Sequence, residues 1–295
     1  MSMGILSKQM SAAGISAGAA GTGTIRITPT GKHFAAYLYA RKANSVAMSE
    51  AEIVTSISSI EVTLNGTQIH LCKPKSYRDY YKHVTGATLA TGCIPIMFYN
   101  PMLETDLQRG VSGIGCKDVN DFAININVTA ANVIVSLECY SDYNPNIKNE
   151  GVGTYIQMIE ATRTIANTGE YDDNSMSTYG ADAALMSMHI YPGTNGSLRS
   201  VTLKTDDFEI MSKATPAILQ TETEMAGFTK LGNVPDTGLE TSITSIHFDL
   251  SKTILSAVSM AGVKTLRMTT DWAVANATNV TILTVFMRGM LPKSA

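Results

Sequence analysis

The second half of this 295-residue chain repeats the order of strand and helix patterns of its first half. In each half an alternating segment is followed by a short helical stretch, an apolar run, a connection and two further strand patterns. Matching positions lie at similar separations along the chain, namely Ile60 and Val201 (141 residues), Phe98 and Phe248 (150), Ile124 and Leu266 (142), and Val135 and Leu283 (148). Such a repeat indicates that one β domain was duplicated. Alternation is common in β proteins, however, so chance alone could supply some of these matches.

Strand patterns dominate both halves. Phe122 to Val128 alternates with period two, and Ile57 to Ile69 alternates around Asn65-Gly66, a tight-turn signal. The second half contains five further strand patterns: Ala184 to Tyr191, Ser197 to Leu203, Thr244 to Leu250, Val263 to Thr269 and Val280 to Met287. The few expected helices are Lys75 to His83, Met102 to Arg109, a helical or irregular lead-in at Thr154 to Asn167, and Phe208 to Glu222 with Pro216 interrupting it.

These patterns predict an all-β chain. Eight strands in each half, with about 130 residues per half, correspond to one jelly roll with two Greek keys. We therefore expect two tandem eight-stranded jelly-roll β-sandwiches with short helices in the loops. The predicted division is an N-terminal arm at 1–23, a first jelly roll at 24–145, a linker at 146–153 and a second jelly roll at 154–295.

Composition narrows the possible functions. The net charge of -3 provides no strong positive field, so we expect no direct contact with nucleic acid. Charged residues make up only 16% of the chain, which is consistent either with surface buried against neighbours or with a loop-rich neutral surface. The start of the chain lacks the basic and apolar regions of a signal peptide, and no apolar run reaches the length of a spanning helix. We therefore expect folding in a cytoplasm.

Residues that could carry chemistry are scattered. The cysteines, which we expect to be reduced and mostly buried, are Cys72, Cys93, Cys116 and Cys139. The histidines are His33, His70, His83, His189 and His247, and they form no metalloprotease motif. Gly110 to Gly115 lacks the strand-loop-helix context of a dinucleotide loop. A spatially assembled Ser/His/Asp triad remains open at this point. We expect Trp272 to pack in a core or between subunits, and we predict no enzymatic activity.

Several segments resemble a known family. They are Gly21 to Ile27 (Gly-x-x-x-Ile-x-Ile), Ser59-Ile-Glu-Val-Thr-Leu-Asn-Gly, Phe98-Tyr-Asn-Pro-Met, Phe122-Ala-Ile-Asn-Ile and Val280-Thr-Ile-Leu-Thr-Val-Phe-Met. Their layout over roughly residues 20 to 290 resembles the double jelly-roll major capsid proteins of tailless, membrane-containing icosahedral bacteriophages, most closely the corticovirus type. The likeness is one of layout, and no single short signature is diagnostic.

This resemblance implies a structural protein of the virion. Three copies would form a pseudo-hexagonal homotrimer, and trimers would tile an icosahedral capsid over an internal membrane. The implied partners are a penta-symmetric vertex protein and internal membrane proteins. Structural calcium ions lie between subunits in some members of the family. No ligand set can be matched here, and Asp172, Asp173 and Asp182 are only acidic loop candidates.

Two other classes of function stay open. A virion spike, or another receptor- or carbohydrate-binding β-sandwich, would need exposed aromatic side chains in its loops. A cupin-like enzyme would need clustered histidines with a carboxylate in a strand context. If the chain is a capsid protein, we expect the loops at 101–116 and 206–229 to pack between subunits, because they carry apolar residues outside clear strands.

Overall fold

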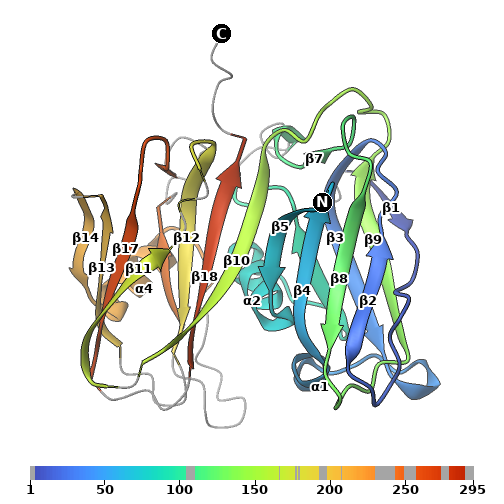
Figure 1. Cartoon of the computed structure of the whole chain (residues 1–295), viewed down its shortest axis with the longest axis horizontal. Coiled ribbons are helices and arrows are strands. Elements are labelled where there is room, and N and C mark those ends of the chain that lie inside the picture. The colour runs from blue at the N-terminus through green and yellow to red at the C-terminus, as the bar shows by residue number, and fades with distance from the viewer. Residues whose placement is uncertain are drawn as a thin grey trace. The chain divides into compact units, whose positions relative to one another are not determined.

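The structure is a computed structural model of the whole chain (Figure 1). It describes residues 4–103, 110–165, 167–176, 178, 180–192, 198–206, 208–229, 243–248, 257–273 and 279–289. The chain divides into two compact units, Met1–Ile159 and Glu160–Ala295. Both consist mainly of strands, which confirms the all-β prediction. No helix in the described ranges has the length and apolar character needed to cross a membrane.

In its described residues, unit 1 contains the strands β1 to β9, the 3-10 helix η1 and the α-helices α1 and α2. Their bounds are β1 Ile5–Lys8, β2 Gly21–Arg26, β3 Lys32–Arg41, η1 Ala43–Ser45, α1 Glu50–Ser56, β4 Ile57–Leu64, β5 Thr67–Cys72, α2 Pro74–Thr85, β6 Cys93–Met97, β7 Ile114–Gly115, β8 Phe122–Val128 and β9 Ser136–Asn144. The next strand, β10 (Tyr155–Thr164), begins in unit 1 and continues into unit 2.

Unit 2 continues with the strands β11 to β18 and the helix α4. Their bounds are β11 Gly169–Met176, β12 Ala183–Tyr191, β13 Leu198–Thr205, β14 Phe208–Ala214, α4 Pro216–Met225, β15 Thr244–His247, β16 Val258–Ser259, β17 Leu266–Trp272 and β18 Asn279–Arg288. The helix expected at Met102 to Arg109 falls largely outside the described residues.

The two units share one strand order. Unit 1 has the sheets β1-β9-β3-β6 and β2-β8-β4-β5, with β7 on β3; unit 2 has β10-β18-β12-β15 and β11-β17-β13-β14, with β16 on β12. When the two-residue strands β7 and β16 are set aside, the first sheet of each unit holds the first, eighth, third and sixth strands. The second sheet holds the second, seventh, fourth and fifth. This is the connectivity of a jelly roll, and it confirms a repeat that runs strand for strand.

The repeat extends to irregularities in the backbone. The third strand is bulged in both units, at Phe34 in β3 and at Met186 in β12. In each case the bulged residue's carbonyl oxygen accepts a hydrogen bond from a phenylalanine N–H that follows the sixth strand, Phe98 at 2.8 Å and Phe248 at 2.9 Å. Because bulges are specific features of a fold rather than defects, their coincidence is strong evidence for duplication.

The turn between the fourth and fifth strands also recurs. Asn65 and Asp206 both adopt the left-handed conformation, with φ of 48° and 50°. Asn65 Oδ1 accepts from the backbone N–H groups of Asn120 and Asp121, and Asp206 Oδ1 accepts from those of Lys264 and Thr265. Each side chain therefore fastens its turn to the chain entering the seventh strand, although one is an amide and the other a carboxylate.

The N-terminal segment differs from the expected arm. Residues 5–8 form β1, which pairs with β9 in register Ile5↔Tyr143 to Lys8↔Tyr140, and β2 already begins at Gly21. A segment rich in Gly, Ala and Ser is flexible by itself. Main-chain pairing with β9 holds residues 5–8 of this segment as the first strand of the jelly roll. The division between the units, at Ile159/Glu160, lies beyond the predicted linker at 146–153.

Three local predictions in the second half are wrong. The lead-in at Thr154 to Asn167 is the strand β10, and the loop expected at Asp172–Asn174 lies inside β11. The expected helix at Phe208 to Glu222 is a strand, β14, followed by α4. Pro216 does not interrupt this helix but opens it, with Thr215 as the N-cap accepting from the backbone N–H of Ile218. Proline is well suited to the first turn, where its missing N–H costs nothing.

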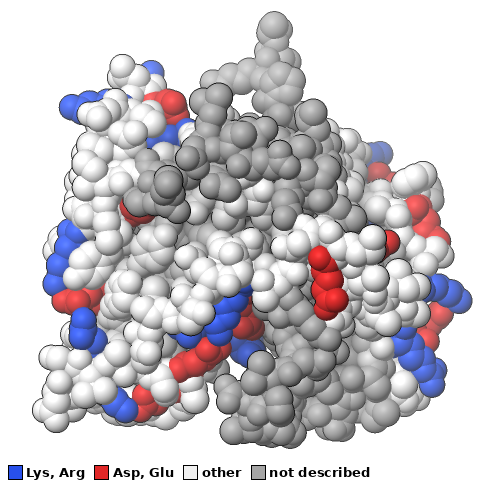
Figure 2. Space-filling model, turned by 180° about the vertical axis from the view of Figure 1, so that it is seen from behind, with Lys and Arg blue, Asp and Glu red and all other residues white. Residues whose placement is uncertain are grey.

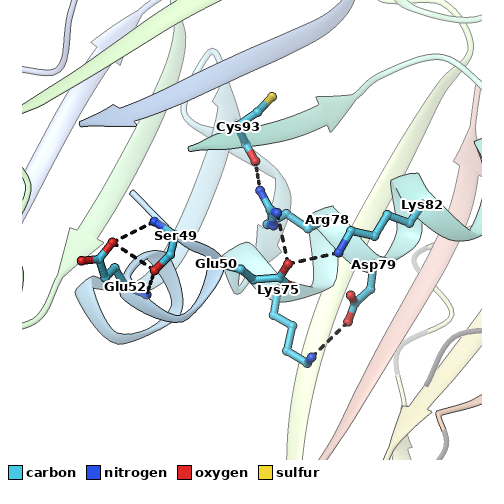
Figure 3. Close-up of polar contacts among 8 residues, drawn as sticks. All are labelled: Ser49, Glu50, Glu52, Lys75, Arg78, Asp79, Lys82 and Cys93. Carbon is cyan, nitrogen blue, oxygen red and sulfur yellow. Dashed lines mark hydrogen bonds and ion pairs between the residues drawn. The ribbon is translucent and has the colours of Figure 1, made fainter. Parts of the chain in front are cut away.

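In unit 1 a polar network fastens the helices to a buried strand (Figure 3). α1 begins with a capping box between Ser49 and Glu52. The Glu50 carboxylate accepts from Arg78 and from Lys82 of α2, both at 3.1 Å. Arg78 also donates to the carbonyl oxygen of Cys93 at the start of β6. Burial opposes ionisation of Glu50, but Arg78 and Lys82 outweigh it and hold its pKa below the ordinary value.

We predict that Arg78→Ala destabilises the chain more than Lys82→Ala does. Arg78 has 6% of its side chain exposed and serves a buried carbonyl, so its loss should lower the free energy of unfolding by about 1–3 kcal/mol. Lys82, at 35% exposure, should cost less than about 1 kcal/mol. Both changes remove one cation from Glu50, which makes them a matched pair. Urea denaturation measures the difference, and an equal loss in both variants would contradict this role of Arg78.

Candidate functional site

The acidic candidates are engaged by partners within unit 2. Asp173 is buried on β11, where Arg163 Nε lies 2.5 Å from its carboxylate and Ser175 donates through both N–H and Oγ. Burial opposes its ionisation, but the hydrogen bonds from Ser175 and Arg163 keep the pKa of Asp173 below the ordinary value. Asp172 accepts from Thr269 Oγ1, and Asp182 forms a two-point ion pair with Arg288 at 2.8 and 3.1 Å. Structural pairing therefore accounts for all three carboxylates.

Other sequence candidates also lie in structural positions. Trp272 is fully buried in the core of unit 2 and donates from Nε1 to Thr270 Oγ1 at 2.8 Å, which confirms the predicted packing role. In the glycine-rich stretch at 110–115, Ile114 and Gly115 form β7 against β3, so this part is a short strand. All four cysteines are buried and none is part of a disulfide, as predicted. Burial raises the pKa of Cys116 and of Cys139 to about 12, which makes these thiols unreactive.

A serine–histidine arrangement occurs in unit 2, but it is enclosed. His189 Nδ1 lies 2.9 Å from Ser245 Oγ, and its Nε2 lies 3.1 Å from Ser187 Oγ. Ser187 and His189 have no exposed surface, and Ser245 has 7%. A nucleophile must be reached by its substrate, so this group is better explained as hydrogen bonding that satisfies buried polar atoms.

Two buried histidines join the sheets of unit 1 through aromatic contacts. His33 on β3 stacks on Tyr143 at 5.2 Å between ring centroids, and His70 on β5 stacks on Tyr77 of α2 at 5.9 Å. Phe122 and Phe98 bridge the two histidines edge-on, with centroid distances of 5.4, 5.5 and 5.7 Å along the series His33–Phe122–Phe98–His70.

Both imidazoles are held neutral. His33 Nδ1 lies 2.6 Å from Ser141 Oγ, and His70 Nε2 donates to the carbonyl oxygen of Ile156 at 2.8 Å. Burial lowers the pKa of each histidine to about 4. The sequence placed His33 beside a strand pattern, but only the fold shows that His33 and His70 face the same core.

The described charged residues form no large patch of one sign on the face drawn in Figure 2. On the face in Figure 2, the described acidic and basic side chains lie in small mixed groups separated by neutral areas. Exposed ion pairs include Lys8–Glu138, Arg26–Asp121 and Lys204–Glu209. Such pairs contribute little stability but leave the surface close to neutral.

Among the described residues, five of the eleven large exposed apolar side chains lie on β1, β14 and α4, and the other six are spread over α1 and the segments between named elements. Ile5 and Leu6 on β1 are 58% and 57% exposed, and Phe208 on β14 is 71% exposed. α4 carries Ile218 and Met225, which lie on one helical face because they are seven residues apart. Exposed apolar side chains at strand edges are typical of surfaces that become covered in an assembly.

We predict that acid destabilises the chain through His33 and His70. Their pKa values in the folded state lie below the unfolded value of 6.5, so the unfolded chain binds more protons. Their contribution to stability is therefore full above about pH 6.5 and falls as the pH drops toward 4. Each histidine contributes up to about 1.4 kcal/mol per pH unit across this interval.

His33→Leu provides the matched variant, since Leu185 occupies the equivalent position beside the bulge in unit 2. The free energy of unfolding, measured by urea between pH 7 and pH 4.5, should depend less steeply on pH in this variant. The expected reduction in slope is about one proton. Identical slopes in the variant and the parent chain would contradict a neutral buried His33.

No family model matches the chain, and no curated protein resembles it in sequence. Solved structures do resemble it. The major capsid protein P2 of bacteriophage PM2 is 14% identical with a TM-score of 0.76, over 96% of this chain and 97% of that one. The major capsid protein of Sulfolobus turreted icosahedral virus is 12% identical, with a TM-score of 0.64 and 96% coverage of both chains.

The Faustovirus major capsid protein is 7% identical, with a TM-score of 0.60, over 96% of this chain and 89% of that one. At such identities a likeness shows the fold. Together with the strand order of both units, it establishes that this chain has the double jelly-roll fold.

Proposed function

We propose that this chain is the major capsid protein of a tailless icosahedral virus. The observation that carries the proposal is the match to viral major capsid proteins over 96% of the chain, at TM-scores up to 0.76. A match of this extent includes both jelly rolls and their order, whereas a single sandwich domain would match only half. On this proposal the protein is located in the virion shell and acts as a structural protein.

The working unit in this proposal is a homotrimer, and trimers tile the shell over an internal membrane. Exposed apolar residues support self-association, because the contact between identical copies buries apolar surface. A vertex protein and internal membrane proteins complete the proposed set of partners. Within residues 206–229, expected to be loops, the structure has β14 and α4, which carry Phe208, Ile218 and Met225.

The spike alternative has weaker support. A sugar- or receptor-binding sandwich needs a group of exposed aromatic rings. Among the residues that the structure describes, Phe208 is the only phenylalanine, tyrosine or tryptophan with an exposed side chain.

The oligomeric state provides the direct test. Light scattering of the purified chain should give three times the 31.5 kDa mass of one chain, and negative-stain images should show blocks with a hexagonal outline. Phe208→Asp and Met225→Asp should each raise the dissociation constant of the trimer at least tenfold, because they place a charge where apolar surface is buried. Val54→Asp, at an exposed position on α1, is the control. A monomer at all concentrations would reject the proposal.

Calcium between subunits is a separate prediction. If such ions are present, EDTA should lower the melting temperature of the trimer, and adding back Ca²⁺ but not Mg²⁺ should restore it, because larger oxygen-rich sites favour Ca²⁺. An unchanged melting temperature in EDTA would exclude structural calcium.

A further inference from the structure

The fifth strand of unit 1 has its outer edge covered. On one side β5 pairs with β4, and on the other Met158 and Ile159 of β10 pair in parallel with His70 and Leu71. His70 Nε2 adds a hydrogen bond to the carbonyl oxygen of Ile156, and Cys72 Sγ one to that of Met158. The start of β10, the strand that continues into unit 2, thus closes this end of the sheet.

β14 of unit 2 is the equivalent of β5 of unit 1, because each pairs with the fourth strand of its unit in the same register. Val62 pairs with His70 in unit 1, and Leu203 pairs with Met211 in unit 2, with both unit 2 residues 141 positions further along. β14 is the last strand of its sheet, and no described strand lies on its outer edge. Phe208 is 71% exposed on this strand. An open edge of this kind offers unpaired N–H and C=O groups to another strand.

The counterpart of β10 is β1. Both are the first strand of their jelly roll and pair with the eighth, β1 with β9 and β10 with β18. β1 ends its sheet, its second edge is open among the described residues, and Ile5 and Leu6 are more than half exposed. The chain therefore has one open fifth strand and one open first strand, the same two kinds of strand that pair at the β5 edge.

We infer that the outer edge of β14 binds β1 of a second copy of this chain as a parallel strand. The pairing repeats between copies the one that β10 makes with β5. It rests on the proposed self-association and names the surfaces involved. Because the two surfaces differ, the contact is heterologous, and repeated contacts of this kind form a closed ring such as a trimer when each copy is rotated by a third of a turn relative to the last. Strand addition supplies main-chain hydrogen bonds, and the alternating side chains supply register.

The far end of β14 restricts this pairing. The register with β13 shifts between Leu203 and Val201, where Met211 and Ala214 are the partners, and Lys213 has a φ of 43°. A second shift, between Leu203 and Lys204, lies within the part of β14 before Lys213. Bulges and an edge lysine are devices that block indefinite strand addition. The open ladder is therefore confined to the part of β14 before Lys213, centred near Met211.

Disulfide trapping in the full chain tests the inference. Neighbouring strands lie about 4.8 Å apart, within the range that a disulfide can span. The variant Leu6→Cys is combined with Ile210→Cys, Met211→Cys or Ser212→Cys, since the exact partner depends on register. The control combines Leu6→Cys with Asn174→Cys, an exposed position on β11 at the opposite end of the same sheet. The four native cysteines are buried and provide little background.

After mild oxidation, at least one β14 variant should run as covalent dimers and trimers on a non-reducing gel, at ten times or more the level of the control. A disulfide formed within one chain would stay at monomer mobility and would overturn the inference. Hydrogen exchange on the unmodified chain gives a second readout, with slower exchange of β14 amides in the trimer than in diluted monomer while β11 stays unchanged. Equal exchange of β14 in both states would also overturn it.

Light scattering separates the two possible failures. A trimer without these cross-links rejects the β1–β14 pairing and leaves the proposed function intact. A chain that stays monomeric rejects the proposed self-association, and the strand pairing with it.

Discussion

The bulged third strand is the constraint on which each unit depends. β3 and β12 are buried along most of their length and lie between two neighbours, the sixth and the eighth strands. At the bulge one carbonyl turns away from the ladder, and a buried carbonyl without a donor would be costly. The N–H group of Phe98, or of Phe248 in unit 2, supplies that donor and thereby fixes where the chain leaves the sixth strand. The positions of the third and sixth strands in each unit are therefore linked at this point by one hydrogen bond.

The sequence predicted strand equivalences better than residue equivalences. The pairs Ile60 with Val201 and Phe98 with Phe248 agree with the registers and hydrogen bonds of the structure. Ile124, however, corresponds to Met268 and not to Leu266, because their partners on the fourth strand are equivalent. A slip of two residues keeps every side chain on the same face, so alternation alone cannot detect it. Bulges shift the register, and they leave almost no sequence pattern.

The wrong predictions also have a physical cause. The first half of β10 is buried on both faces, and its second half becomes partly exposed, so period two is lost across the strand. In β11, adjacent aspartates suggested a loop, but Arg163 of β10 and Thr269 of β17 satisfy their carboxylates. These partners from other strands override the local propensity of β11, and they are invisible before the fold is known.

Duplication explains why the chain can be both regular and asymmetric. The features that both units retain are made by the backbone, namely the strand order, the bulges and the turn at Asn65 and Asp206. The side chains between them have diverged, as His33 and Leu185 illustrate, because a sandwich tolerates different cores when volume and pattern are kept. The edges have diverged in another way, since β5 is already covered while β14 is open among the described residues. If β14 were covered as β5 is, neither fifth strand would offer an edge to a neighbour. Because one copy of this edge is covered and the other is open, the chain offers it in one unit only. A contact made through it joins two different surfaces, and a closed ring of subunits is built from such head-to-tail contacts.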